Sequence, residues 1–170
     1  MLQIITSRKQ LDISQILQVY RQSLQKSGAE NYPQLDDNCQ LIEAEQDFYF
    51  YLLDFLKEPE TYCFAWNVAG KYASILRVEP YRDGVLIEGL ETHPELRKQG
   101  YAKKLLNSVL EYLNRNGTCN VYAHISKDNT ASQKTHLSCG FCCVADYAAY
   151  IDGSVDYKSD TYLYKKRPIG

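Results

Sequence analysis

Four cations lie close to a glycine in the middle of the chain. Gly100 separates Arg97 and Lys98 from Lys103 and Lys104. Downstream, apolar residues recur with the period of one buried helix face, so these cations surround the start of a helix. The helix dipole disfavours positive charge there, whereas the unpaired first-turn amides and a glycine without a Cβ favour an anion. The segment therefore predicts a pyrophosphate site.

Two carboxylates lie on the apolar strand that precedes this loop, residues 86–92. Glu88 is costly in an apolar strand unless it is paired or faces a cleft, so it is our first candidate for a proton acceptor. Glu91 is three residues further on, which places it on the opposite face of a regular strand. For either residue a salt bridge at an edge or surface is the structural alternative.

A second polar segment, residues 129–141, predicts a helix. Asp128 or Asn129 is expected to cap its start and Gly140 to end it. Asn129 and His136 are seven residues apart within it. Taken alone, the segment favours a purely structural reading, with Asn129 as a cap and His136 as a packed side chain. The remaining histidines, His93 and His124, are interpreted as strand-end or surface residues.

Together these two segments resemble the GNAT superfamily of N-acyltransferases. The pattern Arg97-x-x-Gly100-x-Ala102, after a strand ending in Thr92-x-Pro94, is similar to the family's acyl-coenzyme A pyrophosphate loop. The later segment matches the family at five residues and departs from it where the family has a tyrosine and this chain has His136. The matching residues are Asn129, Ala131, Ser132, Gly140 and Phe141. The resemblance covers roughly residues 62–145, and elsewhere only the element order matches.

The resemblance implies that acetyl-coenzyme A is the co-substrate. It also implies that a splayed central strand pairs with the pantetheine arm and offers a backbone N–H to the oxyanion near Leu90–Thr92. The expected cofactor-binding residues lie on this strand, the loop and the second helix. They are Leu90, Glu91, Thr92, Arg97, Lys98, Gln99, Gly100, Tyr101, Ala102, Asn129 and Ser132.

By the same resemblance the reaction is direct attack of a primary amine on the thioester. Only about one alkylammonium in 2,500 is neutral at pH 7, so a base is needed. Glu88 stands where members such as spermidine/spermine acetyltransferases place a carboxylate that often acts through water. His136 is expected to protonate the leaving thiolate. Central strands of the family commonly carry a bulge, which would turn Glu91 toward a ligand as a further catalytic candidate.

Three aromatic residues are candidate acceptor contacts, by resemblance only: Tyr32, Phe48 and Tyr51. Helix faces of this kind are more often core. The acceptor itself stays open between a small amine, an antibiotic, an amino acid and a protein N-terminus, as does the length of the acyl group. Two other hypotheses are a non-catalytic acyl-coenzyme A sensor or scaffold, and a nucleotide phosphate site. The latter lacks the Gly-Lys-Ser/Thr ending of such loops.

The composition and charge distribution of the chain limit the kinds of partner that it could bind. The chain has 170 residues and a net charge of −2, with 5 Lys+Arg against 10 Asp+Glu in residues 1–60 and 14 against 11 thereafter. The basic part suits coenzyme phosphates and the acidic part a cationic acceptor, although solvated surface explains the acidic part equally well. No basic stripe indicates nucleic acid, and no long apolar run or leader indicates a membrane. We therefore expect a cytoplasmic protein.

The six cysteines show no spaced framework of the secreted kind and are expected to be reduced. The run His136-x-x-Cys139-x-x-Cys142-Cys143 lacks a second cluster, so no metal site is predicted.

These residues require a scaffold of alternating strands and helices. The chain reads as one domain, residues 1–170, of the α/β (α+β) class: a mixed, mostly antiparallel sheet of about seven splayed strands with about four helices. A tyrosine-rich C-terminal hairpin turned at Asp152-Gly153 offers a contact for a possible homodimer. A long loop is expected over residues 29–46. The expected strands are 2–5, 62–68, 71–80, 86–92, 119–125, 142–151 and 155–165, and the helices 12–28, 47–57, 102–116 and 129–139.

Overall fold

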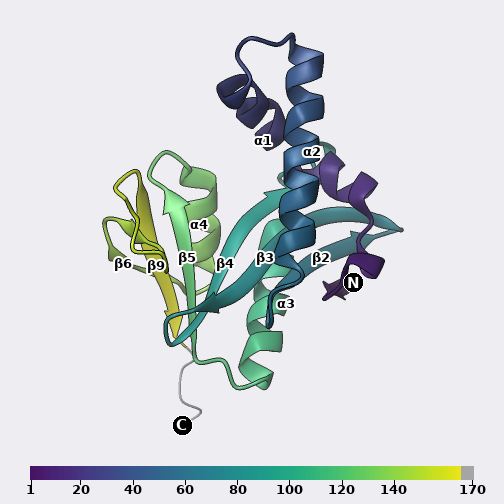
Figure 1. The fold of residues 1–170 in the computed structure, drawn as a ribbon. Helices are drawn as coiled ribbons and strands as arrows, with labels where there is room; N and C mark the ends of the chain where they lie inside the picture. Colours follow the sequence, from purple (N-terminus) through teal and green to yellow (C-terminus); the bar gives the residue numbers. More distant parts are fainter. Residues whose placement is uncertain (166–170) are drawn as a thin grey trace.

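The computed structural model describes residues 1–165, in which a seven-stranded sheet carries helices on both faces (Figure 1). The strand order is β1-β2-β3-β4-β5-β9-β6, and among the described strands only β4 and β5 are parallel neighbours. A separate pair, β7-β8, lies outside this sheet. The expected mixed, mostly antiparallel fold is confirmed.

The elements are β1 (Leu2–Ile5), η1 (Arg8–Gln10), α1 (Ile13–Asn31), α2 (Asp37–Phe55), β2 (Tyr62–Val68), β3 (Lys71–Tyr81), β4 (Gly84–Thr92), η2 (Pro94–Leu96), α3 (Tyr101–Arg115), β5 (Asn120–Ser126), α4 (Thr130–Ser138), β6 (Cys142–Ala145), β7 (Ala148–Ala149), β8 (Val155–Asp156) and β9 (Ser159–Lys165).

Two helix layers cover opposite faces of the sheet (Figure 1). Helices α1 and α2 bury Cys63 and Ala65 of β2, whereas α3 buries the alternate residue, Phe64. Alternation along the strand produces this separation, because successive side chains point to opposite faces. Helix α4 joins α3 on its side through Cys139.

Helix α3 has the buried face expected from its apolar period. Its fully buried side chains are Leu105, Leu106, Val109, Leu110 and Leu113. Burying each leucine contributes about 1.5–3 kcal/mol, which anchors the start of this helix beside the sheet.

Strand β4 separates from β5 part-way along its length. Their parallel pairing runs from Val85↔Val121 to Ile87↔Ala123 and then stops, although both strands continue. On its other side β4 stays paired with β3 as far as Thr92. The splayed centre expected from the sequence is therefore present, and within residues 1–165 one edge of β4 has no strand partner beyond Ile87.

The expected loop over residues 29–46 was wrong, because α2 begins at Asp37. The carboxylate of Asp36 caps it by accepting from the amides of Asn38 and Cys39. Gly28 likewise does not end α1. A Cβ at this position would lie 2.4 Å from the backbone oxygen of Gln40, so this glycine allows α2 to pack closely against α1.

The C-terminal hairpin also differs from expectation. Strand β9 lies between β5 and β6, and β6 stops at Ala145 after a register shift. Residues of the expected long strands form the short β7-β8 pair instead. Alternating tyrosines indicated strand but did not show which strand pairs with which.

No helix within residues 1–165 is long and apolar enough to cross a bilayer. The same residues contain no group of three metal-binding side chains.

Candidate active site

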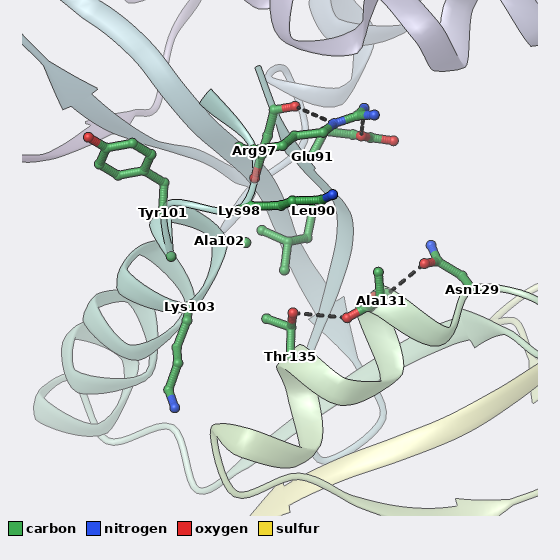
Figure 2. Close-up of a pocket in the computed structure, with 13 residues that line it drawn as sticks. Leu90, Glu91, Arg97, Lys98, Tyr101, Ala102, Lys103, Asn129, Ala131 and Thr135 are labelled. Atoms are coloured by element: carbon green, nitrogen blue, oxygen red, sulfur yellow. Dashed lines mark hydrogen bonds and ion pairs between the residues drawn. The ribbon is translucent and has the colours of Figure 1, made fainter. Parts of the chain in front are cut away.

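A cavity of about 590 Å³ lies between the end of β4, the start of α3 and helix α4 (Figure 2). Every residue expected to bind the cofactor lines it except Gln99. Three further lining residues, Lys103, Ala131 and Thr135, were not among those expected to bind the cofactor. Lys103 was recognised only as a cation near the helix start, and Thr135 gave no signal. The lining residues are Leu90, Glu91, Thr92, Arg97, Lys98, Gly100, Tyr101, Ala102, Lys103, Asn129, Ala131, Ser132 and Thr135.

The start of α3 presents bare amides to this cavity. Gly100 is the N-cap, with φ +78° and no side-chain cap. The first intrahelical bond runs from the amide of Lys104 to the carbonyl of Gly100, so the amides of the first turn have no helical acceptor. A Cβ on Gly100 would meet nothing within 4 Å. Both the left-handed conformation and the open approach explain a glycine here.

The cations around the cavity divide into two kinds. Arg97 braces the end of β4 against α1, since its Nη1 donates to Gln22 at 2.5 Å and its Nη2 lies 3.8 Å from Glu91. Lys98 and Lys103 have no carboxylate within 4.0 Å among the described residues. Figure 2 shows Lys98 extending across the space between α3 and α4. The two lysines therefore supply positive charge to the cavity.

Asn129 caps α4, as expected, because its Oδ1 accepts from the amide of Ser132 at 3.1 Å. The cap uses the side-chain oxygen, which leaves the amide N–H groups as the donors that Asn129 offers to a ligand. Cap and ligand contact are therefore compatible roles.

A bulge brings both carboxylates of β4 to the same face. Arg77 of β3 pairs with Glu88, and Ile75 with Glu91, so β4 has one extra residue between them. Gly89 lies in this bulge with φ +58°. Glu88 lies 4.0 Å from Arg77, and Glu91 accepts from Ser23 of α1 at 2.5 Å. Both carboxylates thus face the α1/α2 layer.

Arg77 holds this bulge, although no sequence pattern singled it out. Its guanidinium lies 5.2–5.8 Å from the ring centres of Tyr20, Phe48 and Tyr51, and its Nη1 donates to the hydroxyl of Tyr20. That hydroxyl in turn donates to the carbonyl of Gly89. Burial lowers the pKa of Arg77, but the surrounding acidic groups outweigh it and raise the pKa overall. Arg77 is therefore a permanent cation beneath the α1/α2 layer.

Of the three candidate acceptor contacts, two lie near Glu88. Phe48 and Tyr51 of α2 both stack over Arg77, which in turn neighbours Glu88. Tyr32 instead donates its hydroxyl to Asp47 of α2.

A second carboxylate, Glu79 of β3, belongs to the same neighbourhood. Burial raises the pKa of Glu79, and the charge of Glu88 raises it further. Burial also raises the pKa of Tyr51 and Tyr150, and Glu88 adds to both shifts. The surface around Glu88 thus combines two negative side chains with aromatic rings, an environment that favours a cation.

A smaller cavity of about 140 Å³ occupies the gap between β4 and β5. Ile87 and Ile125, which face α3, line it together with His124 and Glu91. It shares four lining residues with the larger cavity: Leu90, Glu91, Asn129 and Ser132. The gap therefore connects the cavity at α3 with the opposite face of the sheet.

His136 reaches this gap from α4 and is only 2% exposed. Its Nδ1 lies 2.9 Å from the carbonyl of Ser132, a geometry in which Nδ1 carries the proton and donates. Nε2 is buried and has no partner among the described residues. Burial lowers the pKa of His136 and outweighs the opposing effect of the Ser132 carbonyl. The ring is therefore neutral at pH 7, with a lone pair at Nε2.

Residues 22–141, which span the bulge, the loop at Gly100 and α4, match the model of the acetyltransferase (GNAT) family. The chain belongs to the GNAT family. The model describes this family as one of acetyltransferases.

One curated GNAT relative is the [ribosomal protein bS18]-alanine N-acetyltransferase of Haemophilus ducreyi, which is 34% identical over 59 residues. The match covers 35% of this chain and 41% of that protein, so it spans about two fifths of the relative's length.

Solved GNAT structures share the whole fold at low identity. The PaiA N-acetyltransferase of Thermoplasma acidophilum, in complex with coenzyme A, superposes with a TM-score of 0.70 at 13% identity, over 98% of this chain and 99% of that one. The ribosomal-protein-alanine N-acetyltransferase of Brucella melitensis gives a TM-score of 0.68 at 14% identity, with the same coverage. These likenesses concern the fold alone.

Proposed function

We propose that the protein transfers the acetyl group of acetyl-coenzyme A to a primary amine, with the two substrates approaching from opposite faces of the sheet. The observation that carries this proposal is the gap between β4 and β5. Its cavity shares residues with the cavity at α3, and Glu88 lies on the other face. A thioester held on one side therefore meets a nucleophile arriving from the other.

On the coenzyme side, the diphosphate binds the first-turn amides of α3 and the charges of Lys98 and Lys103. The pantetheine arm lies along the edge of β4 that no described strand pairs with beyond Ile87. Backbone N–H groups near Leu90 on this edge donate to the carbonyl oxygen as it becomes an oxyanion.

On the acceptor side, Glu79 and Glu88 attract an ammonium group between Tyr51 and Tyr150. Burial and the charge of Glu88 both raise the pKa of Glu79, so the ionised form of Glu79 is costly and a bound cation relieves that cost, which supports a positively charged acceptor. The net negative charge of residues 1–60 supports the same class.

The reaction removes two protons from the acceptor nitrogen. Glu88 takes the first through a water molecule, and the amine lone pair attacks the thioester carbonyl. After attack, Nε2 of His136 accepts the second proton from the cationic nitrogen of the tetrahedral intermediate. When the C–S bond breaks, His136 returns that proton to the thiolate, and the products are the amide and coenzyme A. A neutral His136 therefore acts as an acid only after it has received a proton.

The test is acetylation of an amine panel with acetyl-coenzyme A, followed by thiol release and by mass spectrometry of the product. The panel contains alkylamines, diamines, amino acids and a peptide that begins with alanine, because the Haemophilus relative is named for alanine acetylation. Stoichiometric amide and free thiol support the enzyme. Tight acetyl-coenzyme A binding without product across the panel supports the alternative of a non-catalytic acyl-coenzyme A sensor or scaffold.

Gly100→Ala should weaken acetyl-coenzyme A binding about tenfold or more. A Cβ would stand where the diphosphate approaches the amides, and the left-handed φ of +78° adds strain of about 1–2 kcal/mol. Isothermal calorimetry measures the affinity and thermal unfolding the strain.

Gly117→Ala is the matched control, because Gly117 has φ +88° and equally open surroundings but does not line the coenzyme cavity. Both variants should lose similar stability, whereas only Gly100→Ala should lose affinity. Equal affinities for the two variants would contradict a diphosphate site at α3.

A further inference from the structure

His124 faces the same side of the sheet as Glu88, one strand away. In the parallel pairing Leu86 is opposite Tyr122, and the two side chains pack in one cluster. Two residues further along each strand, Glu88 and His124 therefore point to the same face. They lie just beyond the last paired residues, where the strands diverge.

The ring of His124 is buried at its polar atoms and has no hydrogen bond there. Both Nδ1 and Nε2 are inaccessible and without a partner among residues 1–165. The ring is held edge-on by two tyrosines, with centroid distances of 5.4 Å to Tyr81 and 5.0 Å to Tyr150. His124 as a whole is half-buried and lies two residues before the end of β5, so its interpretation as a surface or strand-end residue holds only in part. Buried polar groups are nearly always paired, so two unpaired nitrogens beside a cavity indicate a missing partner.

That cavity is the gap between β4 and β5, which His124 lines together with Gly89 and Glu91. We propose that the ring of Tyr150, which packs on His124 and is itself partly exposed, turns aside when the acceptor amine enters, and that His124 then binds the amine directly. A ring nitrogen accepts a hydrogen bond from the ammonium opposite Glu88 and so orients the amine nitrogen toward the gap. An ammonium has three N–H donors, so it can bind Glu88 through water and His124 at the same time. This role rests on the acetyl transfer proposed above and adds a contact that selects and aligns the amine.

The charge state of His124 suits this role. Burial lowers the pKa of the imidazole, Arg82 lowers it further, and Asp156 opposes the shift. The ring is therefore neutral at pH 7 and keeps a lone pair for the ammonium. The titratable groups that face it come from β3, its turn, β4 and the β7-β8 pair: Tyr81, Arg82, Glu88, Tyr150 and Asp156.

His124→Phe and His124→Gln separate this role from a structural one. Phenylalanine keeps the ring but offers no acceptor, whereas glutamine offers an amide oxygen. We expect His124→Phe to raise KM for the amine tenfold or more, and His124→Gln to restore most of it, with the KM for acetyl-coenzyme A unchanged in both.

Stability should change in the opposite direction to activity. Phenylalanine removes two buried unpaired nitrogens, so His124→Phe should raise Tm by about 2–4 °C. A histidine that only supports the fold would lower Tm when replaced. Tyr122→Phe is the matched control on the same strand and face, because its hydroxyl bonds Asp83 outside the gap; it should lower Tm and leave both KM values unchanged.

The pH profile gives a further test. Below the lowered pKa of His124 the imidazolium repels the ammonium, so kcat/KM for the amine should fall with acid in the wild type. His124→Gln should lack this step. An acidic limb that is identical in the two proteins would overturn the proposal.

A binding measurement made without turnover tests the role of His124 separately from the proposed reaction. With ¹⁵N-labelled histidine in the wild-type protein bound to coenzyme A, adding a panel amine should shift the His124 ring resonances. A shift without any product would support the amine contact and reject acetyl transfer. No shift, or a His124→Phe variant whose amine KM stays within about twofold of wild type, would overturn the role of His124 whether or not the enzyme turns over.

Discussion

Glu88→Gln should lower kcat/KM for an alkylamine by about 10²–10³ at pH 7, the largest effect expected of a single substitution in this protein. Glutamine keeps the size of the side chain and removes its ability to accept a proton. The guanidinium of Arg77 holds this carboxylate on the acceptor face. Glu91 reaches the same face through the bulge, but Ser23 and Arg97 hold it, so we do not expect Glu91 to replace Glu88. Initial rates of thiol release measure the loss.

The direction in which the activity loss of Glu88→Gln changes with pH shows whether Glu88 acts as a base. Without a base, only the amine that is already neutral in solution reacts, so the deficit of Glu88→Gln should shrink as the pH approaches the pKa of the acceptor. An alkylamine with a pKa near 10.4 should therefore show a larger deficit at pH 7 than an α-amine with a pKa of about 7.7–8.0. A deficit that is constant with pH and equal for both amines would contradict the role of base.

Glu111→Gln is the control for the loss of a carboxylate. Glu111 lies on the exposed face of α3, with its side chain 69% exposed and 3.7 Å from Arg115. Such surface pairs contribute about 0–1 kcal/mol, so this variant should keep wild-type rates and nearly wild-type stability.

His136→Phe should lower kcat by about 10² while acetyl-coenzyme A affinity stays within about threefold. The ring packs edge-on against Phe141 at 5.0 Å, and phenylalanine preserves that contact. What it removes is the Nε2 lone pair, and with it the route by which the second amine proton reaches the leaving sulfur. Single-turnover rates and calorimetry separate chemistry from binding.

His136→Tyr is the matching variant, since a tyrosine hydroxyl can donate a proton from the same helix position. It should recover much of the rate that His136→Phe loses. Its rate should also be less sensitive to acid than that of the wild type. Acid below the lowered pKa of His136 protonates Nε2 and removes its lone pair, whereas a tyrosine hydroxyl keeps its proton throughout this range. If His136→Phe turns over at the wild-type rate, His136 has no part in proton transfer.

The sequence by itself determined the coenzyme side of the fold, because the signals there are local. The apolar period of α3 predicts its buried face, and the glycine at its start predicts bare amides. A capping residue, Asn129, lies within three residues of the amide that it bonds. Such contacts join neighbours along the chain, so their spacing can be read directly from it.

The helical layer over the acceptor was only partly readable. Gly28 looked like a helix end because glycine often follows one, yet here it permits α2 to pack closely. The weak period of residues 37–46 concealed the first half of α2, which buries only Leu41 and Ala44 in that stretch. A helix with so few buried residues leaves little pattern to detect.

Only the tertiary structure decided how the acceptor face is assembled. In the sequence Arg77 looks like an ordinary strand residue, but in the structure three rings from α1 and α2 enclose it. The hydroxyl of Tyr20 donates to the carbonyl of Gly89 in the bulge, 69 residues away in the sequence. The extra residue in β4 turns Glu91 to the side of Glu88. Beside the gap, where β5 diverges, the ring nitrogens of His124 have no hydrogen-bond partner within residues 1–165. These arrangements depend on strand register and on contacts distant in sequence, which the order of residues specifies only through the packing of the complete fold.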